Sequence, residues 1–267
     1  MTPQPLPSVA QRLGLSASEE AIARSVLYAS LFDYPLTLSQ LRQTLIESAQ
    51  TPTQILATFE RSAPLRELVE HRNGLFYPAG RQELVAERRR REGRSRAFLK
   101  AHRRLLRLIG GLPYVRLVAL SGSIAHLNLE KGGDLDLFIV TRGAHVWSTA
   151  VAVVLLAKGM RRRRTLCANF VVADTALAFA QQDLFTASQI VGLKPLAGAA
   201  TFQQLLDANP FVRRFYPNFH APACGALPAL QPASPPSSSN PLSYSTVIKW
   251  ARPADEKNTS TRSRTPH

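Results

Sequence analysis

Two aspartates interrupt the start of an apolar run, and this feature restricts the fold more than any other. The run LDLFIV covers residues 135–140, with Asp134 and Asp136 at its beginning. Because side chains alternate along a strand, both carboxylates project from one face, while Leu135 and Leu137 enter a core on the other. Charges at such a position are costly unless a partner compensates them. The sequence therefore predicts a buried strand with a charged site at its start.

A divalent cation is the partner that suits two neighbouring carboxylates. Mg²⁺ takes oxygen ligands and completes its shell with water and substrate phosphates, whereas no His or Cys stands beside the pair at zinc-ligand spacing. Gly122 and Ser123 follow another apolar run, Val115–Leu120, which we expect to be a strand. A glycine lets a ligand approach the backbone closely, and a serine hydroxyl with free backbone N–H groups can hold phosphate oxygens. The chemistry predicted is phosphate binding.

The same residues resemble the signature of a known family. Gly122-Ser123, a gap of ten residues and Asp134-Leu135-Asp136, flanked by apolar strands, look like the pattern of the polymerase-beta-type nucleotidyltransferase superfamily. The resemblance covers about residues 112–175. It implies that Asp134 and Asp136 bind Mg²⁺ or Mn²⁺, and that Gly122 and Ser123 bind a nucleoside triphosphate. It also implies transfer of a nucleoside monophosphate to an acceptor, with release of pyrophosphate. Two metal ions would flank this displacement.

Active members of that superfamily usually carry a third carboxylate on a neighbouring strand. The expected strand Thr165–Ala173 contains no acid, and alternation puts Asn169 on the face of Cys167 and Val171. An amide oxygen can contact a metal or a phosphate but is no useful base. Asp174 follows that strand and becomes the third catalytic acid only if the backbone re-aims it. An active enzyme and a weak or inactive nucleotide- or nucleic-acid-binding regulator on the same fold both stay open.

The charge of the chain favours a polyanionic partner. The net charge is +15, which suits an RNA or another polyanionic acceptor. Residues 81–107 hold eleven cations against three acids, and their apolar positions fit one helical face. These cations form either a phosphate-binding ridge or a solvated helix face. Arg161, Arg162 and Arg163 either contact acceptor phosphates or cover the loop before the next strand.

The division of the chain follows from its changes in composition. Three expected helices and the Asn73-Gly74 hairpin resemble, more weakly, a winged helix-turn-helix. Its third helix offers only Arg61 as a cation, so we favour protein packing over DNA reading and over a transcriptional regulator. The fold class expected is α+β, with a small mixed β-sheet core and flanking helices. The predicted parts are a disordered leader (1–16), a winged-helix-like domain (17–80), a basic connecting helix (81–111), a nucleotidyltransferase-like domain with a helical extension (112–220) and a disordered Pro/Ser-rich tail (221–267).

The cysteine pattern and the apolar segments predict a cytoplasmic protein. Cys167 and Cys224 form no CxxC or Cys/His cluster, which fits a reducing compartment. The apolar segment 146–157 is short for a bilayer span, which takes about twenty residues. We therefore expect no membrane partner, and a buried helix with Trp147 in the core.

Overall fold

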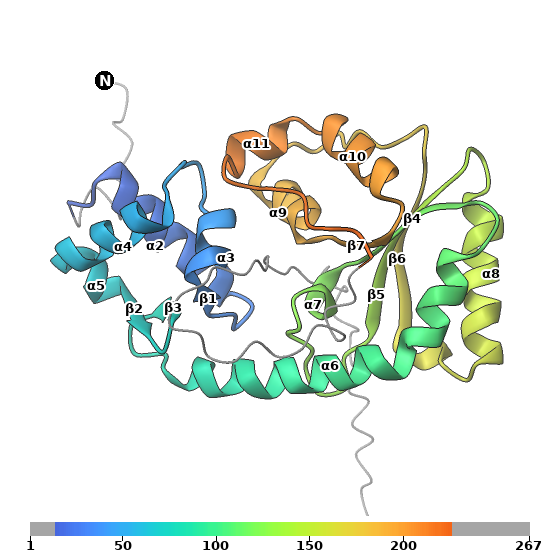
Figure 1. Ribbon diagram of the computed structural model, residues 1–267, viewed down its shortest axis with the longest axis horizontal. Helices are drawn as coiled ribbons and strands as arrows, with labels where there is room; N and C mark the ends of the chain where they lie inside the picture. Colours follow the sequence, from blue (N-terminus) through green and yellow to red (C-terminus); the bar gives the residue numbers. More distant parts are fainter. Residues whose placement is uncertain (1–13, 226–267) are drawn as a thin grey trace, which may run out of the picture.

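The computed structural model describes residues 14–225 as an α+β fold with two separate sheets (Figure 1). The leader and the tail predicted from the sequence lie outside the described residues, apart from 14–16 and 221–225. The α+β class is therefore confirmed. Within the described part, no helix combines the length and the apolar character needed to cross a bilayer.

The N-terminal part has the predicted helices and hairpin, plus one further helix. Its elements are α2 (Ala17–Ser30), β1 (Leu36–Thr37), α3 (Leu38–Gln43), α4 (Pro52–Arg61), α5 (Ala63–Leu68), β2 (Val69–Arg72) and β3 (Leu75–Pro78). Thr37 and Thr51 cap α3 and α4, each in a capping box with the glutamine three residues later. Asn73 and Gly74 have φ of 54° and 74°, the left-handed values that a two-residue hairpin turn requires. The three strands pair in the order β1-β3-β2.

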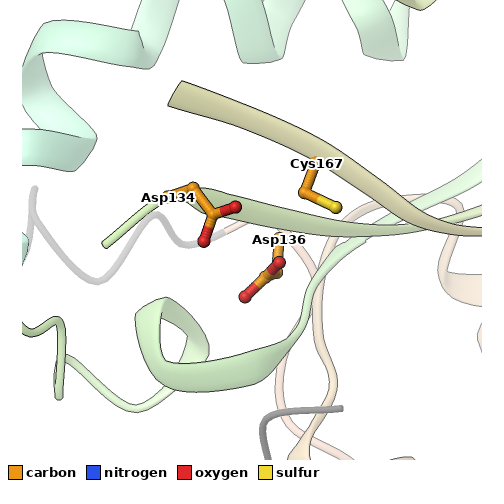
Figure 2. Close-up of side chains that lie close together, drawn as sticks. All are labelled: Asp134, Asp136 and Cys167. Atoms are coloured by element: carbon orange, nitrogen blue, oxygen red, sulfur yellow. The ribbon is translucent and has the colours of Figure 1, made fainter. Parts of the chain in front are cut away.

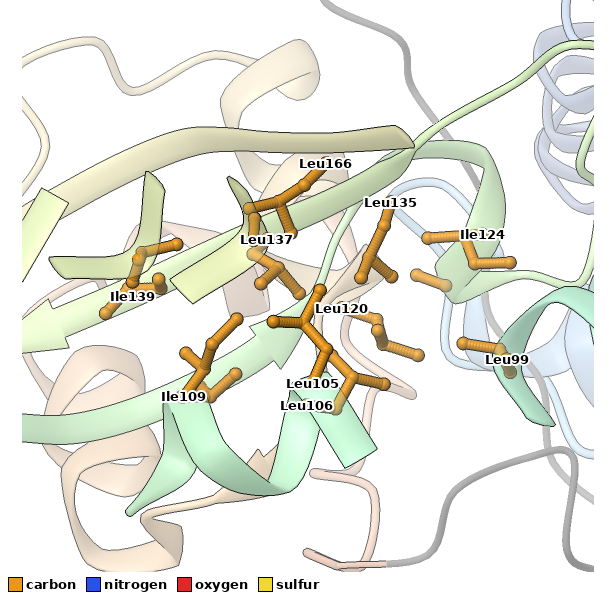
Figure 3. Packing of buried hydrophobic residues seen from close by; sticks show 14 of the residues in the cluster. Leu99, Leu105, Leu106, Ile109, Leu120, Ile124, Leu135, Leu137, Ile139 and Leu166 are labelled. Atoms are coloured by element: carbon orange, nitrogen blue, oxygen red, sulfur yellow. The ribbon is translucent and has the colours of Figure 1, made fainter. Parts of the chain in front are cut away.

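One long helix connects the N-terminal part to the larger sheet. Helix α6 (Glu83–Gly110) has 28 residues, which corresponds to about 42 Å of axis. At its start, Leu84 and Val85 pack with Leu75 and Tyr77 of the hairpin. Its second half packs against the larger sheet through Leu99, Leu105, Leu106 and Ile109 (Figure 3). The helix ends at the Gly-Gly pair, as the sequence predicts.

The second part is built on a mixed four-stranded sheet. Its elements are β4 (Val115–Leu120), α7 (Gly122–Ala125), β5 (Leu135–Thr141), α8 (Val146–Gly159), the 3₁₀ turn η1 (Arg163–Thr165), β6 (Leu166–Ala173), α9 (Leu184–Gly192), β7 (Lys194–Ala197), α10 (Ala199–Asp207) and α11 (Phe211–Phe215). The strand order is β6-β5-β4-β7. Strands β5 and β6 are parallel, and β4 is antiparallel to both β5 and β7. The sequence patterns do not predict strand β7 or helix α11.

A bulge in β6 changes which of its side chains share a face. Leu137 pairs with Ala168 but Phe138 pairs with Phe170, so the backbone of Asn169 has no counterpart on β5. One extra residue reverses the alternation that follows it. Phe170 therefore lies on the face of Phe138, and Val171 packs against the opposite core with α6 and α8. The expected sharing of one face by Cys167 and Val171 is wrong for this reason.

Helix α8 is only partly buried. Val153 and Ala157 are buried against the sheet. Trp147, by contrast, is 82% exposed, and Val151 and Leu155 are exposed along the same side of the helix. The expectation that Trp147 belongs to the core is wrong, because the sheet takes up only one side of this uniformly apolar helix.

Candidate metal and phosphate site

Strands β5 and β6 bring three metal-ligating side chains to one end of the sheet. Asp134 directly precedes β5, and Asp136 pairs with Cys167 of β6. One ligand atom from each of these three residues lies within 4.8 Å of the other two (Figure 2). Asp136 is buried, with 6% of its surface exposed, whereas Asp134 and Cys167 are partly exposed. Two carboxylates this close repel each other, and a bound cation relieves that repulsion.

The glycine-serine turn lies directly against the second acid. Gly122 has φ of 60°, and a Cβ at this position would overlap with Asp136 Oδ2 and lie 3.1 Å from its Cγ. The backbone N–H of Ser121 donates to the Asp136 carbonyl at 3.0 Å. The two halves of the sequence pattern, separated by ten residues, therefore touch. Glycine is required here for its left-handed backbone and for its missing side chain.

Unpartnered polar atoms are concentrated around this turn. Ser121 Oγ, Ser123 Oγ, His126 Nδ1 and Asn128 Oδ1 are buried and have no hydrogen-bond partner in the structure. Only four other buried side-chain polar atoms within residues 14–225 share this condition. A buried polar atom without a partner costs about 1–3 kcal/mol, so such a cluster is typical of a site that binds a polar ligand.

A lysine from the unpredicted strand β7 brings a positive charge to the turn. Lys194 lies opposite Leu120 in the β7–β4 ladder, directly before Ser121. Burial lowers the pKa of Lys194 to about 8. Its charge also helps to lower the pKa of His126, although the burial of that imidazole is the larger cause. Segment 192–195 is visible in the sequence only as a short mixed stretch with no periodicity that singles out the lysine.

The N-terminal part supports the segment that follows the turn. The edge of Tyr34 meets the ring of His126 at 6.0 Å between centroids, and Arg88 lies over Tyr34 at 4.7 Å. Asn128 Nδ2 donates to the Phe32 carbonyl at 2.9 Å. The ring of His126 is thus held by an internal packing contact with Tyr34.

The remaining predicted site residues fall into separate places. Arg161, Arg162 and Arg163 precede β6, at the same edge of the sheet as Asp134, because β5 and β6 are parallel. Asp174 lies at the other end of β6: its N–H donates to Thr141 and its Oδ1 accepts from Gly143 N at 2.9 Å. Because of the bulge, Asp174 falls on the same face of the sheet as Asp136. It nevertheless lies seven residues after Cys167, which corresponds to about 20 Å along the strand. The side chain of Asn169 lies outside the described part of the structure.

Much of the basic ridge is engaged within the protein. Arg91 binds Asp33 and Glu87, Arg94 donates to the Leu129 carbonyl, and Arg88 donates to Gln40. The cations of α6 for which the structure records no such partner concentrate toward its end, at Lys100, Arg104 and Arg107, all exposed. Several cations in the first half of the predicted ridge are therefore engaged in contacts within the protein, whereas these three near the end of the helix are exposed.

Comparison with known proteins returns no relative. No family model, no curated protein and no solved structure matches this chain.

Proposed function

We propose that the protein is a Mg²⁺-dependent nucleotidyltransferase of the cytoplasm. It would transfer a nucleoside monophosphate from a nucleoside triphosphate to an acceptor hydroxyl and release pyrophosphate. The observation that carries the proposal is the contact of Gly122 with the Asp136 carboxylate, beside Asp134. This contact joins a phosphate-binding turn to a cation-binding pair, the combination that phosphoryl transfer requires.

Each side chain has a role that its chemistry allows. Asp134 and Asp136 would hold the divalent cation, which neutralises phosphate charge when bound. The Ser123 hydroxyl, which has no partner among the described residues, would donate to a phosphate oxygen. Lys194 adds positive charge near the turn, where it would partly neutralise the negative charge of the triphosphate.

The third ligand position favours a second candidate function. Cys167 lies where a third carboxylate would complete the metal site. A thiol is a softer ligand than a carboxylate and suits Mg²⁺ less well. This substitution favours a weak enzyme or a regulator that binds nucleotides without turnover.

Label transfer distinguishes the two functions. The protein is incubated with Mg²⁺ or Mn²⁺, each α-labelled nucleoside triphosphate and pools of RNA, proteins and small alcohols. An enzyme transfers label to one pool, and Asp134→Asn or Asp136→Asn abolishes the transfer. Cys167→Asp supplies the missing carboxylate and should raise the transfer rate. For the regulator, calorimetry would detect Mg-nucleotide binding in the wild type without transfer to any pool.

Asp174→Asn is the matched control. It removes the same charge at the opposite end of β6, where the side-chain oxygen accepts from Gly143 N. This variant should bind and transfer like the wild type. If wild-type protein neither transfers label nor binds a Mg-nucleotide, both functions are refuted.

We further propose an RNA or a similar polyanion as the acceptor. The exposed end of α6 and Arg161–Arg163 supply cations on the second part of the molecule. Arg104→Gln with Arg107→Gln should weaken tRNA binding and reduce its salt dependence by about two counterions. Arg66→Gln with Arg89→Gln, at exposed positions of α5 and of the first half of α6, removes equal charge. Equal losses in the two double variants would argue against a localised surface.

The N-terminal part is proposed as a winged-helix-like module that packs against protein. Its order of helix, short strand, three helices and hairpin supports that assignment. Tyr28 and Ile46 pack with helices α9 and α11, and the Glu47 N–H donates to the Phe215 carbonyl at 2.7 Å. Binding of duplex DNA at physiological salt, lost in Arg61→Gln, would contradict this role.

A further inference from the structure

An apolar cavity continues the acidic face of the sheet. Phe138 follows Asp136 by two residues of β5, which corresponds to about 6.6 Å of strand, and Phe170 lies beside it on β6. These two rings form one wall of a cavity of about 130 Å³. Phe179 and Ile190 of the segment that covers the sheet line it as well.

The bulge in β6 is what puts the second ring there. Without the extra residue at 169, regular alternation would turn Phe170 into the core shared with α6 and α8. With it, Phe170 and Phe138 lie with their ring centroids 6.1 Å apart. The irregularity therefore builds an aromatic wall beside the acids.

Two residues that line this cavity each carry a hydrogen-bond donor that has no partner among residues 14–225. Ser121 is 7% exposed, and its Oγ is buried and unpaired. Gln189 Nε2 of α9 is also buried and unpaired. Both residues line the cavity, and leaving such atoms unsatisfied is costly unless a ligand accepts from them.

The lining specifies the chemistry of the ligand. None of the residues that line the cavity carries a charge, so it suits a neutral group. Aromatic walls favour a planar ring that can stack. A volume of about 130 Å³ is close to that of a cavity of roughly 150 Å³ that holds one benzene ring. The two donors require acceptor atoms on the edge of that ring.

We propose that this cavity binds the base of the nucleotide and selects a pyrimidine nucleoside triphosphate. The inference rests on the proposed function, because it places the triphosphate at Gly122 and Ser123. Ser121 joins the two sites, since it lines the cavity while its N–H binds the Asp136 carbonyl. Two acceptor atoms of the pyrimidine edge, O2 and O4 of uracil or O2 and N3 of cytosine, accept from Gln189 Nε2 and Ser121 Oγ, and the single ring lies against Phe138 and Phe170.

Calorimetric binding of α,β-methylene analogues of UTP, CTP, ATP and GTP with Mg²⁺ tests the inference. We expect the pyrimidine analogues to bind at least about tenfold more tightly than the purine analogues. Gln189→Leu, which removes one donor at similar volume, should weaken pyrimidine binding by about tenfold. It should leave binding of Mg-tripolyphosphate, which has no base, unchanged. Ser121→Ala serves as a second variant, with folding of both checked by thermal denaturation.

Gln204→Leu is the matched control, because Gln204 is exposed on α10 and should not affect any ligand. Equal or tighter binding of purines, or unchanged pyrimidine affinity in both cavity variants, overturns the inference while Mg-tripolyphosphate still binds. If the wild-type protein does not bind Mg-tripolyphosphate at all, the proposed function is overturned instead. The two failures are therefore distinguishable.

Discussion

Gly122 fixes how closely the turn approaches the acids. Its left-handed backbone brings the chain against the Asp136 carboxylate, with no room for a side chain. An L-residue in this conformation costs about 1–2 kcal/mol, and the overlap with Asp136 adds to that. The residue therefore combines a backbone requirement with a steric one.

Gly122→Ala should displace Asp136 and weaken Mg-nucleotide binding by about tenfold or more, as calorimetry would measure. Gly143→Ala is the control, since Gly143 also has a positive φ of 52° but a Cβ added there would meet nothing within 4 Å. Both variants should lose similar backbone stability, but only the first should lose affinity. Similar affinities in the two variants would contradict the role of the contact.

His126 makes the fold sensitive to acid. Burial, with the charges of Lys194 and Arg88, holds its pKa well below the ordinary 6.5. Below pH 6.5 the imidazole of His126 binds a proton in the unfolded chain but not in the native protein. The free energy of unfolding therefore falls as the pH falls, by at most about 1.4 kcal/mol per pH unit from this group.

His126→Gln removes this titration and keeps a similar volume. Urea unfolding of both proteins between pH 7.5 and pH 4.5 should show the wild type losing stability faster below pH 6.5. Parallel curves for the two proteins would show that the native imidazole takes up the proton after all.

Spacing in the sequence suffices to predict Asp134, Asp136, Gly122 and Ser123 as one group, because alternation and a strand-following glycine are local properties. The partners from distant segments are harder to predict. Lys194 reaches the turn through sheet pairing, and Cys167 lies beside the two acids only because the β5–β6 register sets it opposite Asp136. Register between distant strands depends on tertiary packing, which no local pattern records.

At the scale of elements, α8 shows where periodicity fails. Residues 146–157 are almost uniformly apolar, so the sequence gives no indication of which side is buried. The structure buries Val153 completely and leaves Trp147 82% exposed. Similarly, β6 contains no glycine or proline from which its bulge could be predicted.

The orientation of α8 predicts unequal effects of two substitutions. Val153→Ala should lower the free energy of unfolding by about 2 kcal/mol, because it removes buried methyl groups. Trp147→Ser, at an exposed site, should change it by less than about 0.5 kcal/mol. Urea denaturation measures both. A larger loss for Trp147→Ser than for Val153→Ala would mean that the helix is turned the other way.

At the scale of the whole molecule, the two sheets share their supporting elements. Helix α6 contributes apolar residues to both cores. Tyr28 hydroxyl and Ser188 hydroxyl lie 3.0 Å apart, and Asn218 Nδ2 donates to the Gln50 carbonyl at 3.0 Å. These contacts join the N-terminal part to α9 and to the chain after α11.

We therefore expect the described part to unfold in one cooperative transition. Scanning calorimetry should give a van't Hoff enthalpy equal to the calorimetric enthalpy. Two resolved transitions, or a van't Hoff enthalpy well below the calorimetric one, would show that the parts unfold independently.

The shared helix also limits how such a chain can be recombined. If recombination with another protein exchanged one half of α6, the half that packs on the hairpin would be joined to a foreign half that packs on the sheet. The rotation of the two halves about the helix axis would then not be matched. Each residue of offset rotates one half by about 100° relative to the other. Exchange of the N-terminal part with another protein would thus succeed only in whole helical repeats, so the two parts are inherited most safely as one unit.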